Sequence, residues 1–168
     1  MKKTTRPLFN ARIRPVEVKD FAFIRSLAAQ FPTFTVPSEY VLWLFTHFHP
    51  DYCRVLEQST GDLRAYLLAM PTSRPTNGIA LWQVAAATPS HSFALEYFTA
   101  YLRDLVEHTG ATSISFTASQ DAATLRLIRS LAKQFFACEV AQLDPVLVGQ
   151  GEHEFRLSIA KIAQRTRS

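Results

Sequence analysis

The chain has 168 residues, of which 48% are hydrophobic, 13 are Phe and 19% are charged, and this composition excludes disorder and predicts one compact domain. Eight of the 18 basic residues lie before residue 15 or after residue 160, where no acidic residue occurs, so the two ends carry +8 and the remainder −4. Basic ends without interleaved aromatic residues or a recognition helix are typical of solvated termini and do not predict nucleic-acid binding.

Targeting and redox signals are weak. No apolar run approaches the ~20 residues that span a bilayer, and no hydrophobic segment of a secretory signal follows the basic residues 1–6. Cys53 and Cys138 are far apart among apolar residues, which favours two reduced thiols. We therefore expect a cytoplasmic protein that does not enter the membrane, with a basic tail over 1–11, a single domain over 12–160 and a basic tail over 161–168.

The first half of the domain predicts two helices between strands. Ser38 is the expected N-cap of the second helix, and His49-Pro50 ends it. Ser59-Thr-Gly-Asp62 has the composition of a hairpin turn. The expected elements are a strand over 12–17, helices over 21–30 and 38–48, and strands over 53–58, 63–70 and 78–87.

The second half repeats the alternation of helix and strand. Gly110 closes an amphipathic helix, and an alternating strand pattern follows it. The expected elements are helices over 93–108 and 121–135, and strands over 111–117, 138–142 and 153–159. Strands interrupted by helices in this order imply a mixed sheet that is covered on both faces.

Four segments carry a family resemblance: Ser38-Glu-Tyr with the leucine-rich helix after it, Leu81-Trp-Gln-Val-Ala85, residues 117–140, and Gly151-Glu-His-Glu154. With the order of elements, they resemble the GNAT superfamily of acyl-coenzyme A N-acyltransferases, and within it the L-2,4-diaminobutyrate acetyltransferases of ectoine biosynthesis. The resemblance implies an α/β (α+β) GNAT fold, with a mixed, mostly antiparallel sheet of about seven strands and helices on both faces. It also implies acetyl transfer from acetyl-CoA to a small primary amine, and a homodimer, which related enzymes often form.

One loop departs from the family. In the family, the strand that contains Trp-Gln-Val-Ala is followed by a loop of the form Arg-x-x-Gly-x-Gly or Ala. The backbone N–H groups of that loop hold the pyrophosphate at a helix N-terminus. Here residues 88–96 contain neither glycine nor arginine; Ser92 takes the arginine position, and Phe93 and Leu95 take the glycine positions. Side chains there obstruct the cradle. Losing two or three hydrogen bonds of about 1.5–3 kcal/mol each would weaken binding ~100-fold or more.

Other positions follow from the resemblance. The backbone of Val84, Ala85 and Ala86 is expected to pair with the pantetheine arm of the cosubstrate where the strand leaves its neighbour. Gln120 or Asp121 replaces the usual Asn after the fifth strand, and Thr35 replaces an acidic partner of the substrate ammonium. The residues assigned to the cosubstrate are Val84, Ala85, Ala86, Ser92, Phe93 and Gln120.

Candidate catalytic residues lie near the C-terminal end. Glu152 and Glu154 are two apart on a predicted strand, so they share one face and His153 takes the other. An alkyl ammonium must lose a proton before it attacks a thioester, and either carboxylate is a candidate base for it, with His153 in substrate binding. The alternative is a solvated turn for Glu152 and an exposed edge for Glu154.

The aromatic candidates also have two interpretations. Trp82 and Gln83 are expected to point to opposite faces of their strand. Trp82 either walls a substrate pocket or is a core aromatic residue, and Tyr40 either faces the acceptor site or covers the sheet. His47 and His49 lie near Asp51 in the sequence, but we interpret them as a helix-end and a loop histidine rather than as metal ligands. We interpret Cys138 as a core residue rather than a nucleophile.

Two functions from different classes remain open. The first, which we favour, is a divergent acetyltransferase with a rebuilt cosubstrate loop. The second is a binding or interaction module that keeps the fold and has lost acyl-CoA. The altered loop favours the second, whereas Trp82 and the Gly151–Glu154 segment favour the first.

Overall fold

A computed structural model of the chain describes residues 11–32, 34–73, 77–87, 91–119, 129–130, 140–142 and 152–158, with the backbone alone for several of these positions. The helices are α1 (Phe21–Ala28), α2 (Glu39–Phe48) and α3 (His91–Thr109), with short 3-10 turns η1 (Val18–Asp20) and η2 (Pro50–Tyr52). The strands are β1 (Ala11–Pro15), β2 (Arg54–Gln58), β3 (Leu63–Thr72), β4 (Gly78–Ala86), β5 (Ser113–Ser119), β6 (Val140–Gln142) and β7 (Glu152–Ser158).

The strands form one seven-stranded sheet in the order β1-β2-β3-β4-β5-β7-β6. Every neighbouring pair is antiparallel except β4 and β5, which are parallel. The α3 helix is the crossover between these two parallel strands, as a parallel connection requires. The sequence prediction of a mixed, mostly antiparallel sheet of about seven strands is confirmed.

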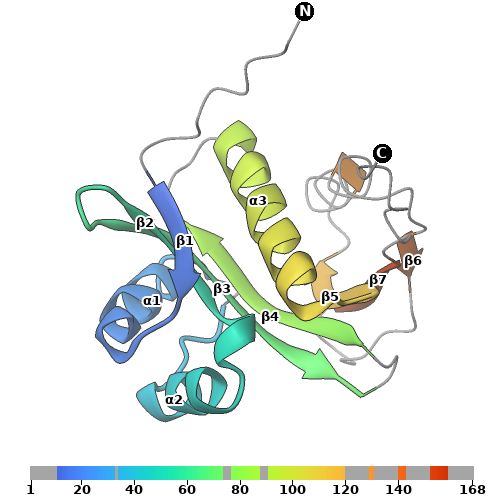
Figure 1. Cartoon of the computed structure of the whole chain (residues 1–168), viewed down its shortest axis with the longest axis horizontal. Helices are drawn as coiled ribbons and strands as arrows, with labels where there is room; N and C mark the ends of the chain where they lie inside the picture. Colours follow the sequence, from blue (N-terminus) through green and yellow to red (C-terminus); the bar gives the residue numbers. More distant parts are fainter. Residues whose placement is uncertain are drawn as a thin grey trace, which may run out of the picture.

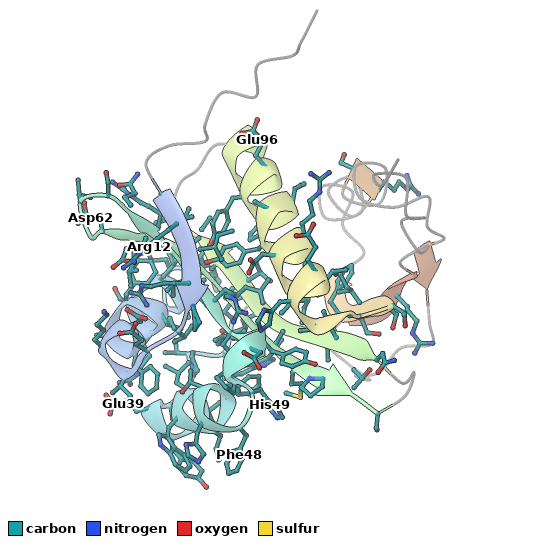
Figure 2. All side chains as sticks on the ribbon, in the orientation of Figure 1. Arg12, Glu39, Phe48, His49, Asp62 and Glu96 are labelled. Carbon is teal, nitrogen blue, oxygen red and sulfur yellow. The ribbon has the colours of Figure 1, made fainter. Side chains whose placement is uncertain are left out.

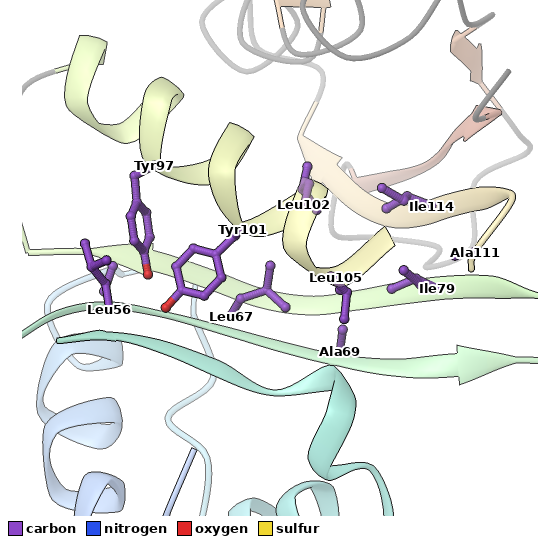
Figure 3. Close-up of a cluster of buried hydrophobic side chains, with 11 residues drawn as sticks. Leu56, Leu67, Ala69, Ile79, Tyr97, Tyr101, Leu102, Leu105, Ala111 and Ile114 are labelled. Carbon is purple, nitrogen blue, oxygen red and sulfur yellow. The ribbon is translucent and has the colours of Figure 1, made fainter. Parts of the chain in front are cut away.

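Helices cover both faces of the sheet. The α1 and α2 helices lie on one face, and α3 crosses the other (Figure 1). Between α3 and the strands lies a core that includes Leu67, Ile79, Tyr101 and Leu105 (Figure 3). A second core, with Ile24, Leu42 and Tyr66, lies on the face of α1 and α2. The predicted cover on both faces is therefore confirmed.

Local signals for a helix start, a hairpin and a helix end act as predicted. The Ser38 Oγ accepts a hydrogen bond from the Val41 N–H at 3.2 Å and so caps α2. Gly61 has a φ of 88° in the β2–β3 hairpin, where only glycine is free of strain. Gly110, with a φ of 66°, ends α3 in the same left-handed region.

Part of the predicted second half lies outside the described residues. Only Arg129 and Ser130 of the helix predicted over 121–135 are described, and both are helical. Gln120, Cys138 and both basic tails lie outside the description, apart from Ala11. Within the described ranges, no helix is long and apolar enough to cross a membrane.

Candidate active site

The sheet opens between β4 and β5. The two strands pair from Gly78↔Ser113 to Leu81↔Phe116. Both strands continue beyond these pairs, but within the described chain no further residues of β4 and β5 pair, while β7 pairs with the other edge of β5 from Ser113 to Ser119. Within the described chain, β4 residues 82–86 therefore have a strand partner only on the β3 side. Peptide groups of this segment that point toward β5 are left to bind something other than the sheet.

A β-bulge at Trp82 marks where the opening begins. Leu68 pairs with Gln83, and the next residue, Ala69, pairs with Leu81, so Trp82 is the extra residue of β4. A bulge bends its strand and increases the local twist. The last β4–β5 pair involves the residue just before Trp82, which fits a strand that turns away from β5 at the bulge.

The bulge brings Trp82 and Gln83 to the same face of the sheet. The Trp82 ring stacks on Phe45 of α2 at a centroid distance of 4.9 Å. The Gln83 side chain accepts a hydrogen bond from the Tyr66 hydroxyl at 3.2 Å and donates one to the Thr35 carbonyl at 2.7 Å. Tyr66 belongs to the core of the α1 and α2 face, and the partly buried Phe45 packs against that core. The prediction of opposite faces is wrong, because regular alternation does not continue through a bulge.

The residues predicted to meet the pantetheine arm line the open edge of β4. Val84 and Ala86 pack toward the α3 core, whereas Ala85 is buried toward α1 and α2. Their side chains are thus used in packing, and those of their peptide groups that point away from β3 remain for binding. This arrangement suits the backbone role that the sequence assigned to them.

Trp82 and Tyr40 are both accessible on the side of α2. Trp82 is 37% exposed, so it is not a fully buried core residue, although one ring face lies on Phe45. Tyr40 is 67% exposed and stacks on Trp43 at 6.1 Å. It lies in the first turn of α2, which runs from Glu39 to Phe48 (Figure 2). Tyr40 therefore does not cover the sheet, and both rings are available to a ligand.

The three β7 candidates lie beside the same end of the sheet. Glu152 pairs with Ser119, His153 with Ala118 and Glu154 with Thr117, all beyond the last β4–β5 pair. The structure describes the backbone of this strand segment only. It thus brings the β7 candidates to the end of the sheet where β4 is open, and their catalytic roles stay predictions.

The altered loop also leads to this end. The α3 helix begins at His91, so Ser92 and Phe93 lie in its first turn. Residues 88–90 lie outside the described part, as does Gln120, and the side chains at 91–95 are not described. The predicted obstruction of the pyrophosphate cradle stays a prediction.

The histidines near α2 have separate partners. The His47 ring stacks on Trp43 at 4.7 Å, His49 meets Tyr52 edge to face, and Asp51 contacts His108 at 3.2 Å. Among the described residues, no group of three or more His, Cys, Asp or Glu side chains is placed to hold a metal ion.

The Cys53 thiol is not in an environment that would make it reactive. Cys53 is fully buried on the α1 and α2 face, and its Sγ lies 3.7 Å from the Ala69 carbonyl oxygen. Burial raises the pKa of the thiol to about 11, so the nucleophilic thiolate is scarce at neutral pH. Cys53 is a core residue.

Gln83 is a residue to which the sequence analysis assigned a face of the strand but no role. It is 6% exposed, and both ends of its amide are hydrogen-bonded. One available signal was a long polar side chain in an otherwise apolar strand, because a buried amide requires partners. Its partner Thr35, however, is 48 residues away in the sequence.

No model of a known protein family matches the sequence, and no curated protein matches it. Solved structures do match the fold. The diaminobutyrate acetyltransferase EctA from Paenibacillus lautus, in complex with its substrate L-2,4-diaminobutyric acid and coenzyme A, gives a TM-score of 0.73 at 21% identity, over 89% of this chain and 95% of that chain. Ard1 from Thermoplasma volcanium gives 0.67 at 14% identity, over 90% and 99%. The dodecameric spermidine N-acetyltransferase from Vibrio cholerae gives 0.65 at 16% identity, over 94% and 99%. The chain has the GNAT fold that its sequence predicted.

Proposed function

We propose that the protein is an N-acetyltransferase that moves an acetyl group from acetyl-CoA to a small primary amine. The observation that carries the proposal is the opening of the sheet after Leu81↔Phe116, which leaves the β5-side edge of β4 residues 82–86 without a strand partner in the described chain. An extended pantetheine arm contains amides that can pair with such an edge as a strand would. Structures with this fold have been solved with coenzyme A.

The reaction needs a neutral amine beside the thioester carbonyl. The amine nitrogen forms a bond to the carbonyl carbon, the C–S bond breaks, and the thiolate leaves and takes up a proton. An alkyl ammonium has a pKa of about 10.4, so a base must first remove a proton at neutral pH. We assign this role to Glu152 or Glu154, whose backbone lies at the open end of the sheet.

The acceptor that we propose is a diamino acid such as 2,4-diaminobutyrate. Trp82 and Tyr40 present accessible rings on the α2 side, and aromatic faces attract ammonium groups. Carboxylates at 152 and 154, which share one face of the strand, would complement the two amino groups. The similarity to the diaminobutyrate enzyme supports this choice. We further propose that the enzyme works in the cytoplasm on a free small molecule, as a homodimer.

A second candidate is a binding module with the same fold and no acyl-CoA. The observation that favours it is the start of α3 at His91, which places Phe93 and Leu95, rather than glycines, at the beginning of the helix. Under this alternative, the nucleotide is not held, and the open edge of β4 binds a partner segment.

Calorimetry distinguishes the two candidates. The enzyme proposal predicts that acetyl-CoA binds and that a diamine or diamino acid is acetylated in its presence. Acetylpantetheine, which lacks the pyrophosphate, serves as a control ligand: equal affinity for both thioesters would mean that the pyrophosphate adds nothing. No heat and no thermal shift with either thioester would contradict the enzyme proposal.

A paired substitution tests the loop itself. Phe93→Gly with Leu95→Gly is expected to strengthen acetyl-CoA binding ~100-fold if these side chains block the cradle. Ala94→Gly is the matched control, because it adds helix flexibility in the same turn without opening those two positions. Binding that appears only in the double variant would favour the binding module for the native chain.

A further inference from the structure

Gln83 joins the opened strand to the segment between α1 and α2. Its Nε2 donates to the Thr35 carbonyl oxygen at 2.7 Å, and its Oε1 accepts from the Tyr66 hydroxyl at 3.2 Å. Tyr66 is itself fully buried on β3. An amide is suited to this place because it offers a donor and an acceptor at once. Methionine has a similar length and offers neither.

The bulge makes this contact available. Because Trp82 is the extra residue of β4, Gln83 pairs with Leu68 and its side chain lies on the face of α1 and α2. The same bulge directs Trp82 onto Phe45 of α2. Two consecutive residues at the start of the sheet opening thus hold the α1–α2 region, one through a hydrogen bond and one through a ring stack.

The segment held by Gln83 leads to the acceptor side of the proposed site. Thr35 is exposed and lies only three residues before Ser38, the cap of α2. Tyr40 follows in the first turn of that helix. On the other side, Phe34 stacks on Phe31 at 4.9 Å. Fixing the Thr35 carbonyl therefore fixes the approach to α2 and the position of Tyr40.

We propose that Gln83 is a positioning residue that sets the acceptor side of the site by anchoring residues 34–38 to the bulge of β4. This inference depends on the proposed acetyltransferase function. The residue need not touch the amine, because it acts through the loop. Binding of the thioester relies on the peptide groups of β4 and is not expected to depend on this hydrogen bond.

The main test is Gln83→Met, measured by steady-state kinetics with acetyl-CoA and 2,4-diaminobutyrate. We expect the KM for the amine to rise about tenfold, as losing the hydrogen bond to the Thr35 carbonyl implies, with the KM for acetyl-CoA changed less than about twofold. The matched control is Gln58→Met, which removes a hydrogen bond from Arg64 Nε at the β2–β3 hairpin and is expected to leave both KM values unchanged. An unchanged amine KM in Gln83→Met, or an equal rise in both KM values, would overturn the proposal.

Amide hydrogen exchange tests the anchor without relying on activity. Residues 34–38 should exchange about tenfold faster in Gln83→Met than in the unmodified chain, while β3 is unchanged. If the native chain acetylates no amine, the proposed function fails, and exchange alone decides whether the anchor exists. Gln83→Asn, one methylene shorter but still polar, should show the same effects if the methionine variant does not fold. Native exchange at 34–38 in Gln83→Asn would overturn the anchor.

Discussion

Arg14 and Asp20 form a two-point ion pair at the junction of β1 and η1. Arg14 Nη1 lies 2.7 Å from Asp20 Oδ2, and Nη2 lies 2.9 Å from Oδ1. Both residues are buried, and Asp20 Oδ2 also accepts from the Glu17 N–H at 2.8 Å. Glu57 of β2 accepts from Arg14 Nε at 3.0 Å. The network therefore fixes the entry to α1 against the edge of the sheet.

Asp20→Ala is expected to destabilise the protein by about 3 kcal/mol, because it leaves the buried Arg14 without its main partner. We place the effect at the lower end of the usual range, since Glu57 remains in contact with Arg14. Urea denaturation measures it. Arg12→Ala is the control: that side chain is 72% exposed in its pair with Glu57, and its loss should cost less than about 1 kcal/mol. Equal effects would contradict this account.

Glu57 is expected to make the stability of the fold depend on pH in the acidic range. Hydrogen bonds from Arg14, and then from Arg12, lower the pKa of this carboxyl group from 4.5 to about 2. A carboxyl pKa lowered by folding adds stability that is complete above the unfolded pKa and is lost as the pH falls through the folded one. Stability should therefore decline between pH 4.5 and 2, and Glu57→Gln should flatten that decline.

Urea midpoints at pH 5, 4 and 3 test this expectation. Glu39→Gln, which removes one negative charge from an exposed ion pair with Arg25, controls for the change in net charge. If Glu57→Gln and the native chain lose stability in parallel over this range, the assignment to Glu57 is wrong.

The sequence predicted much of the fold because the relevant signals are local. The core face of α1 consists of Phe21, Ile24, Leu27 and Ala28, which recur at the spacing of a helix and can be read from the local sequence. The Ser38 cap and the hairpin at Gly61 likewise depend on a few consecutive residues. Helix ends shifted by one or two residues, as they usually do. In contrast, the burial of Tyr97 and Tyr101 in α3 was not predicted, because tyrosine is intermediate between the buried and the exposed residue types.

The site was less predictable because it depends on register. The bulge at Trp82 arises from how β3 and β4 pair, and a single extra residue changes which side chains share a face. The opening between β4 and β5 likewise depends on where the pairing of these two strands ends, at Leu81↔Phe116, and the chain between them is more than 25 residues long. Val84, Ala85 and Ala86 were assigned from the family resemblance, which carries information that periodicity does not, and their contact with the cosubstrate stays a prediction.

Replacing either of two buried tyrosines by phenylalanine is expected to change the stability of the protein in opposite directions. Tyr101 is fully buried against the sheet, and within the described chain its hydroxyl has no hydrogen-bond partner (Figure 3). Tyr101→Phe removes a desolvated hydroxyl and should stabilise the protein by about 1 kcal/mol. Tyr66→Phe breaks the bond to Gln83 and should destabilise it by about 1 kcal/mol. Thermal and urea unfolding of both variants measure the contrast. Destabilisation of Tyr101→Phe by a similar amount would mean that its hydroxyl is satisfied.

Substitution of Trp82 distinguishes a role in packing from a role in substrate binding. Its ring lies on Phe45 yet is 37% exposed, so Trp82→Ala should cost about 2 kcal/mol, less than for a fully buried Trp. If the exposed face also contacts the amine, the acceptor KM should rise at least tenfold in the variant. Phe45→Leu is the control, because it loses the ring stack and leaves Trp82 in the chain. Similar stability losses with an acceptor KM raised only in Trp82→Ala would support a ligand-facing role, whereas unchanged KM values in both variants would confine Trp82 to packing.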